Sequence, residues 1–176
     1  MGLFSRNASC EVKPPVVRPA TAEDADTIVR FVHALSLHDG GRVSRLTRDA
    51  LLRDGFGPDP AFSVLLAEVD GAAAGFALYF AGYDTDRAAR GVYMSDLYVE
   101  DGFRRRGVGR ALIRGVAAAC RENGGKWMFW SVLKRNRNAR RFYRTVAPEL
   151  KDVVLCAALG DSFELLATGN RDCRDQ

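Results

Sequence analysis

The segment VEDGFRRRGVGR, residues 99–110, joins an apolar run that predicts a strand over 91–99 to a periodic run that predicts a helix over 106–123. A helix that begins at such a turn presents unpaired backbone N–H groups and a partial positive charge. Gly107 and Gly109 leave that backbone without a covering Cβ, and the arginines at 104–106 add charged donors. The segment therefore predicts a phosphate-binding turn.

The same residues exclude two common phosphate loops. The dinucleotide fingerprint G-x-G-x-x-G fails because Leu112 occupies the position of its third glycine. The sequence also lacks the loop G-x-x-x-x-G-K-[ST]. What is left is R-x-x-G-x-G between a strand and an apolar helix.

The flanking sequence predicts one mixed sheet. Pro19 stops a first strand, Thr21 caps the helix that follows, and Asp70-Gly71 predicts a tight hairpin. The expected elements are strand 16–19, a helix from Thr21 to Leu35, helix 47–54 closed by Gly55, strands 63–69, 73–83 and 91–99, helix 106–123, strand 126–132, helix 138–145 and strand 153–159. The order β-α-α-β-β-β-α-β-α-β indicates an α/β fold, a twisted mixed sheet with helices on both faces.

The composition indicates a globular chain. With 176 residues, 47% hydrophobic and 27% charged, it is long enough for one core and short for two. We expect a flexible segment over 1–15, a single domain over 16–168 and a tail over 169–176. No apolar run approaches the roughly 20 residues that a bilayer requires, and the N-terminus lacks the apolar centre of a signal peptide. A cytoplasmic protein with no membrane partner is expected.

Cysteine spacing argues against a metal ligand, and the net charge favours a polyanionic one. The four cysteines form no C-x-x-C pair and the chain has two histidines, so we expect no metal site. The net charge is +4 and the sequence pI near 9.0. Six of the eleven residues from Lys134 to Arg144 are basic. Such a surface attracts polyanions, either nucleic acid or a polyphosphorylated cofactor.

A second motif favours the cofactor. Residues 136–143, NRNARRFY, are similar to the N-x-x-A-x-x-F-Y element of the GNAT superfamily of N-acetyltransferases, and the R-x-x-G-x-G turn resembles that superfamily's acyl-CoA pyrophosphate loop. The segments VRPAT (17–21), LLRDGFG (51–57), AEV (67–69), GFA (75–77) and YD (83–84) resemble its diamine, or spermidine/spermine, branch. The resemblance covers residues 16–168 and implies the GNAT fold.

The resemblance implies an acetyl-CoA-dependent N-acetyltransferase in which the amine attacks directly through a tetrahedral intermediate. The main-chain N–H groups of Leu97 to Val99 are expected to bind the oxyanion. The Tyr143 hydroxyl is expected to protonate the departing thiolate, and Phe142 to pack in the core. The residues carried over as binding the cofactor are Leu97, Tyr98, Val99, Arg104, Arg105, Arg106, Gly107, Val108, Gly109, Arg110, Asn136, Asn138 and Arg141.

One departure from the branch concerns the catalytic base. Where the diamine enzymes carry Glu-Asp on the fourth strand, this chain has Ser95 and Asp96. Asp96 is the candidate base, with a structural or substrate-binding role as the alternative. Strand alternation is expected to turn its side chain to the face opposite Ser95. A pocket water, or uptake of the neutral amine, is a further alternative.

A second departure concerns the acceptor groove. In HDGGRVSR, residues 38–45, Asp39 is the only acid, while Arg42 and Arg45 would repel a polyamine and could pair with a carboxylate. We assign Asp39, Ser95 and Asp96 to substrate binding and expect a diamine, a polyamine or an amino-acid-like amine. His33 and His38 are expected to be surface or hydrogen-bonded histidines.

Two other classes of function stay open at this point. A nucleic-acid-binding module could use residues 134–144, with Phe142 and Tyr143 as stacking partners. A protein that binds acetyl-CoA but transfers poorly would explain Ser95. Our prediction is the enzyme, with no nucleic-acid partner. A homodimer that exchanges the last strand and residues 162–168 is expected by analogy alone.

Overall fold

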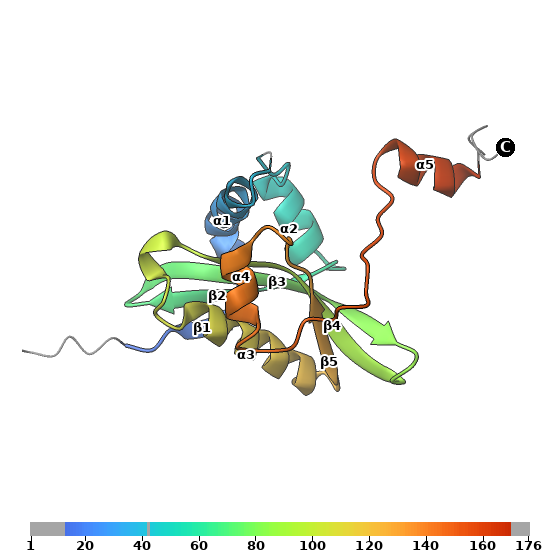
Figure 1. The fold of residues 1–176 in the computed structure, drawn as a ribbon. Coiled ribbons are helices and arrows are strands. Elements are labelled where there is room, and N and C mark those ends of the chain that lie inside the picture. Colours follow the sequence, from blue (N-terminus) through green and yellow to red (C-terminus); the bar gives the residue numbers. More distant parts are fainter. Residues whose placement is uncertain (1–12, 42, 170–176) are drawn as a thin grey trace, which may run out of the picture. The chain divides into compact units, whose positions relative to one another are not determined.

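Residues 13–41 and 43–169 are described by the structure, a computed structural model (Figure 1). The chain divides into two compact units, Met1–Arg140 and Arg141–Gln176. No helix in the described ranges is long and apolar enough to cross a bilayer. The single domain over 16–168 stays a prediction, and most of the expected flexible segment lies outside the described residues.

The first unit is built on a five-stranded sheet with the order β1-β2-β3-β4-β5. The first three strand pairs are antiparallel, whereas β4 and β5 run parallel. Between β2 and β3, Asp70 and Gly71 have φ of 53° and 77°, the left-handed backbone that a two-residue hairpin turn needs. The predicted hairpin is confirmed. The strands are β1 (Val16–Pro19), β2 (Ser63–Val69), β3 (Ala72–Asp84), β4 (Ala89–Val99) and β5 (Trp127–Trp130).

Helices cover both faces of this sheet (Figure 1). On one face lie α1 (Ala25–His38) and α2 (Arg48–Phe56), and Phe31 of α1 stacks on Phe76 of β3 with ring centroids 6.1 Å apart. On the other face lies α3 (Val108–Glu122), so close that a Cβ added at Gly115 would come within 2.9 Å of Val17 and Leu65. The predicted mixed sheet between two helical layers is confirmed.

Two of the element ends that differ from the prediction have a clear cause in the structure. Helix α2 continues through Gly55 to Phe56. The glycine serves packing there rather than helix termination, since a Cβ would come within 2.6 Å of the Phe62 ring. Helix α3 begins at Val108 rather than at 106. Arg105 and Gly107 have φ of 61° and 82°, a left-handed backbone that an α-helix does not contain.

The predicted strand over 153–159 is wrong. In the second unit these residues have no regular structure, and a helix, α5 (Asp161–Thr168), follows them. A strand forms only where a neighbour takes up its backbone N–H and C=O groups, so an apolar, β-branched composition is not sufficient. Among the described residues no strand pairs with this segment. The helix expected over 138–145 is present as α4 (Arg137–Tyr143).

An ion-pair cluster joins the start of α1 to the sheet. Arg18 of β1 lies 2.7 Å from the Asp24 carboxylate and 2.7 Å from Glu68 of β2. The Thr21 backbone N–H also donates to Asp24, at 2.8 Å. The hydrogen bonds from Arg18 hold the pKa of Asp24 at about 2, below its ordinary value of 3.8. Asp24 is therefore charged, and paired, at neutral pH.

Replacing Asp24 by Asn tests this cluster. A carboxyl with a lowered folded-state pKa stabilises the fold above its unfolded pKa, and that stabilisation is lost as the pH falls through about 2. We expect Asp24→Asn to lower the free energy of unfolding by about 1–2 kcal/mol at neutral pH, measured by urea denaturation. The difference should shrink as the medium is made acidic. A difference that stays constant would show that the carboxylate charge is not its source.

Candidate functional site

The turn before α3 has the backbone geometry of an anion site. Gly107 caps α3, and the N–H groups of Val108 and Gly109 have no carbonyl one turn earlier in the helix to which they can donate. They lie at the positive end of the helix dipole. A Cβ at position 107 would meet no atom within 4 Å, so the left-handed φ of 82°, rather than crowding, requires glycine there.

The three arginines of this turn have different surroundings. Arg104 pairs with Asp101 at 2.7 Å. Arg106 lies over the ring of Phe103, 5.5 Å from its centroid. Arg105 is exposed, and its left-handed φ of 61° costs about 1 kcal/mol. Arg104 and Arg106 thus brace the turn, while Arg105 carries positive charge into the solvent beside it.

Strand β4 loses one of its neighbours part of the way along. β3 accompanies it to Val99, whereas β5 accompanies it only from Gly91 to Met94. Trp130, which lies opposite Met94, is the last residue of β5. Beyond this pair, no strand of the described chain lies on the β5 side of β4. The sheet is therefore open between β4 and β5.

Two backbone donors of β4 face that opening. The Glu100 N–H donates to the Ala74 carbonyl, on the β3 side, at 3.0 Å. Successive N–H groups of a strand point in opposite directions, so those of Leu97 and Val99 point away from β3. They are two of the three N–H groups, Leu97 to Val99, that were expected to bind an oxyanion, whereas the N–H of Tyr98 points toward β3.

A bulge at Ser95 changes the geometry expected for the acidic residue. The register jumps from Leu78 opposite Asp96 to Tyr79 opposite Met94, so Ser95 has no partner on β3. The extra residue breaks the alternation of side chains, and the Ser95 hydroxyl donates to the Asp96 carboxylate at 3.1 Å. The prediction that the two side chains face opposite sides is therefore wrong, because it assumed a regular strand.

The environment of the Asp96 carboxyl favours its neutral form. Burial raises the pKa of Asp96 above its ordinary value of 3.8, the hydrogen bond from Ser95 opposes this, and the negative charge of Asp39 raises the pKa further. Asp39 is thus near enough to interact with Asp96. Two neighbouring carboxylates attract a cation, and a raised pKa suits proton acceptance near neutral pH.

Asp39 is held in place by the way α1 ends. The Gly40 N–H donates to the Leu37 carbonyl and the Gly41 N–H to the Ser36 carbonyl, each at 3.1 Å. This pair of bonds is the Schellman motif, which needs a left-handed residue, and Gly40 has φ of 71°. Two consecutive glycines therefore fix Asp39 as the last residue of the helix turn.

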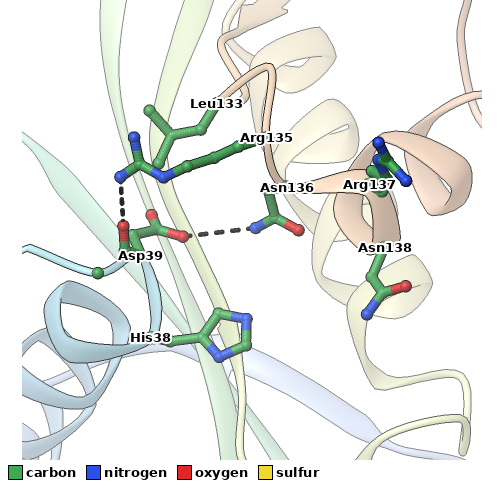
Figure 2. A pocket seen from close by; sticks show the side chains of 8 residues that line it. His38, Asp39, Leu133, Arg135, Asn136, Arg137 and Asn138 are labelled. Atoms are coloured by element: carbon green, nitrogen blue, oxygen red, sulfur yellow. Dashed lines mark hydrogen bonds between the residues drawn. The ribbon is translucent and has the colours of Figure 1, made fainter.

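A pocket of about 480 Å³ opens between the end of α1 and the loop that follows β5 (Figure 2). The Arg135 guanidinium donates to the Asp39 backbone carbonyl at 2.5 Å, and the Asn136 amide donates to the Asp39 carboxylate at 3.4 Å. Arg137 lies on the side away from Asp39 (Figure 2). The pocket therefore carries both signs of charge. Its lining residues are His38, Asp39, Gly40, Leu133, Arg135, Asn136, Arg137 and Asn138.

Among the predicted acceptor residues, Ser95 donates to Asp96, and the charge of Asp39 acts on Asp96. The Tyr98 side chain, 9% exposed, packs on Phe31 with ring centroids 5.5 Å apart, and its backbone N–H points toward β3, so neither faces the opening beside β4. Arg141 and Tyr143 belong to the second unit. Arg42 lies outside the described residues.

Sequence reasoning missed His38, Arg135 and Arg137 as pocket residues. His33 contacts the Leu46 carbonyl at 3.0 Å, as expected of a hydrogen-bonded histidine, whereas His38 lines the pocket. In the sequence, His38 is next to Asp39 and Arg135 is next to Asn136, both of which had been predicted as site residues. This adjacency is the one sequence signal that could have identified them. Only the fold shows that His38, Arg135 and Arg137 line the same pocket. In the described ranges no group of three potential ligands could hold a metal ion.

The known proteins that this chain resembles in sequence or in fold are acetyltransferases. Residues 18–146 match the acetyltransferase (GNAT) family. The chain is 28% identical over 145 residues to a thialysine N-epsilon-acetyltransferase of Bos taurus, covering 76% of this chain and 84% of that protein. It is 30% identical over 115 residues to an L-ornithine N5-acetyltransferase of Arabidopsis thaliana, covering 65% and 47%. An aminoglycoside acetyltransferase from an uncultured soil metagenomic sample shares the fold, with a TM-score of 0.69 at 19% identity over 83% of this chain and 97% of that one.

The family match and the relatives define the class of the protein as an N-acetyltransferase. The chain belongs to the GNAT acetyltransferase family. The family predicted from the two sequence motifs is confirmed.

Removing the charge of Asp39 tests the interaction between the two carboxylates. In Asp39→Asn we expect the pKa of Asp96 to fall toward its ordinary value, because a negative neighbour makes ionisation harder. NMR titration of the Asp96 carboxyl carbon measures this. Asp26→Asn, which alters a carboxylate of α1 that is 82% exposed, is the matched control and should have no effect. An unchanged Asp96 pKa in Asp39→Asn would contradict the pairing.

Proposed function

We propose that the protein transfers the acetyl group of acetyl-CoA to a primary amine of a small molecule. The observation that carries the proposal is the family match together with the open edge of β4, which presents backbone donors beside the bulge that carries Asp96. The charge of Asp39 also acts on Asp96. A primary amine is a cation at neutral pH and must lose a proton before it attacks. Two carboxylates, one with a raised pKa, suit both requirements.

The donor half of the proposal is supported by the chemistry of the available N–H groups. The first turn of α3, at Val108 and Gly109, suits the pyrophosphate of acetyl-CoA. The N–H groups of Leu97 and Val99 suit a carbonyl oxygen that gains negative charge. Acetyl-CoA carries both chemical groups. The arginines at 104–106, Arg110, Asn138 and Arg141 stay in the proposed donor site through the family resemblance.

Deprotonating a lysine-like ammonium at neutral pH costs about 4.6 kcal/mol of free energy. In our proposal Asp39 holds the ammonium, Asp96 accepts its proton, and the neutral nitrogen attacks the thioester carbon. The N–C bond forms, and the negative charge on the carbonyl oxygen is stabilised by the N–H groups of Leu97 and Val99. The C–S bond then breaks, and the thiolate takes a proton from the Tyr143 hydroxyl, a role that rests on the resemblance. The nitrogen, cationic after the attack, gives up its second proton as the amide forms, and that proton restores the Tyr143 hydroxyl through water.

An amino-acid-like acceptor fits the pocket better than a polyamine. Asp39 lies on one side of the pocket and Arg137 on the other (Figure 2). A molecule with an ammonium at one end and a carboxylate at the other can pair with both, whereas the second ammonium of a polyamine would meet a guanidinium. The relatives that acetylate thialysine and ornithine support the same choice.

An acetylation assay over a panel of amines tests the proposed function. Acetyl-CoA is combined with thialysine, ornithine, lysine, putrescine or spermidine, and free thiol is followed. We expect turnover with the amino acids above that with the polyamines. Asp96→Asn and Tyr143→Phe should each lower kcat about 100-fold, because a proton donor or acceptor is lost. Asp26→Asn should match the parent.

Three results would count against the proposal. No amine-dependent thiol release would remove the transferase activity. A preference for spermidine over ornithine would remove the amino-acid-like acceptor. Salt-sensitive retention on RNA that persists at saturating acetyl-CoA would favour a nucleic-acid-binding module instead.

A further inference from the structure

The side chain of Asn136 contacts two parts of the first unit, the start of α4 and Asp39 at the end of α1. Its Oδ1 accepts from the Ala139 backbone N–H at 3.0 Å and its backbone carbonyl accepts from the Arg140 N–H at 3.1 Å, so it is the N-cap of α4. A backbone N–H can only donate, so the amide oxygen must face the helix and the NH₂ group must face the other way. That NH₂ group donates to Asp39 Oδ1 at 3.4 Å.

The loop that carries Asn136 is shaped to make this contact. The Asn136 backbone N–H donates to the Leu133 carbonyl at 2.9 Å and closes a turn directly after β5. From this turn the Arg135 guanidinium reaches the Asp39 backbone carbonyl at 2.5 Å. Both side chains extend toward Asp39 (Figure 2). The end of α1 is therefore held at its backbone and at its carboxylate by adjacent residues of one loop.

We propose that Asn136 is a positioning residue for the acceptor: it orients the Asp39 carboxylate in the pocket and connects it to the start of α4. The proposal rests on the proposed function, in which Asp39 binds the substrate ammonium. It moves Asn136 from the donor site, where the family resemblance put it, to the acceptor site.

The physical consequence is specific to acceptor binding. A carboxylate on a helix end can adopt several rotamers, and fixing one of them when substrate binds costs conformational entropy. The hydrogen bond from Asn136 supplies that order beforehand. Its loss is expected to raise KM for the amine, with little effect on kcat or on the affinity for acetyl-CoA.

Asn136→Ser isolates the contact. Serine caps a helix as well as asparagine does, so α4 keeps its N-cap, but the shorter side chain cannot reach Asp39. We expect KM for the best amine of the panel to rise about tenfold, the value of one hydrogen bond to a charged group. In an Asp39→Ala background Asn136→Ser should have no further effect on KM.

A matched control separates positioning from capping. Thr47 caps α2 by accepting from the Ala50 N–H at 3.2 Å and does not line the pocket. Thr47→Ala therefore removes a helix cap elsewhere in the same unit. It should lower thermal stability and leave KM for the amine unchanged.

Two outcomes would overturn the proposal. The first is a weaker affinity for acetyl-CoA, measured by calorimetry, with an unchanged KM for the amine. This would return Asn136 to the donor site. The second is an equal effect of Asn136→Ser in both Asp39 backgrounds, which would show that the two residues act independently.

A failure of the proposed function is distinguishable from a failure of the Asn136 proposal. If the parent acetylates no amine of the panel, the proposed function fails, and the double-mutant cycle is measured on the free energy of unfolding in urea. Non-additive effects of Asn136→Ser and Asp39→Ala would then support the contact, and additive effects would overturn it.

Discussion

Strand β4 has a neighbour on both sides as far as Met94 and on one side only beyond it. Backbone N–H groups that lack a partner are costly wherever water is excluded, so a bare strand edge inside a fold is a natural place for a ligand to bind. Leu97 and Val99 present their N–H groups at that edge. The departure of β5 thereby provides the donors on which the proposed chemistry depends.

The acidic residues lie where this opening begins. The bulge at Ser95 comes one residue after the last β4–β5 pair, and it redirects the side chains of Ser95 and Asp96 toward each other. Asp39 approaches from the end of α1, where Gly40 and Gly41 stop the helix. A backbone irregularity and a helix cap, rather than a regular strand, thus place the two carboxylates to which the proposed function assigns the substrate ammonium.

The sequence predicts the features whose causes are local. The hairpin at Asp70-Gly71 and the turn at Gly107 follow from the backbone that these residues favour. The bulge at Ser95 could not be predicted, because it exists only in the register with β3. Nor could the contact between Asp39 and Asn136, 97 positions apart. The strand expected over 153–159 failed for the same reason, since pairing is decided by the rest of the fold.

In the proposed function, the N-terminus of α3 and the open edge of β4 together bind the acetyl donor. An NMR titration of the ¹⁵N-labelled protein with coenzyme A tests it most directly. We expect the largest changes in amide shift at Val108 and Gly109, with smaller changes at Leu97 and Val99. Changes confined to the basic residues 134–140, with the α3 turn unaffected, would contradict it.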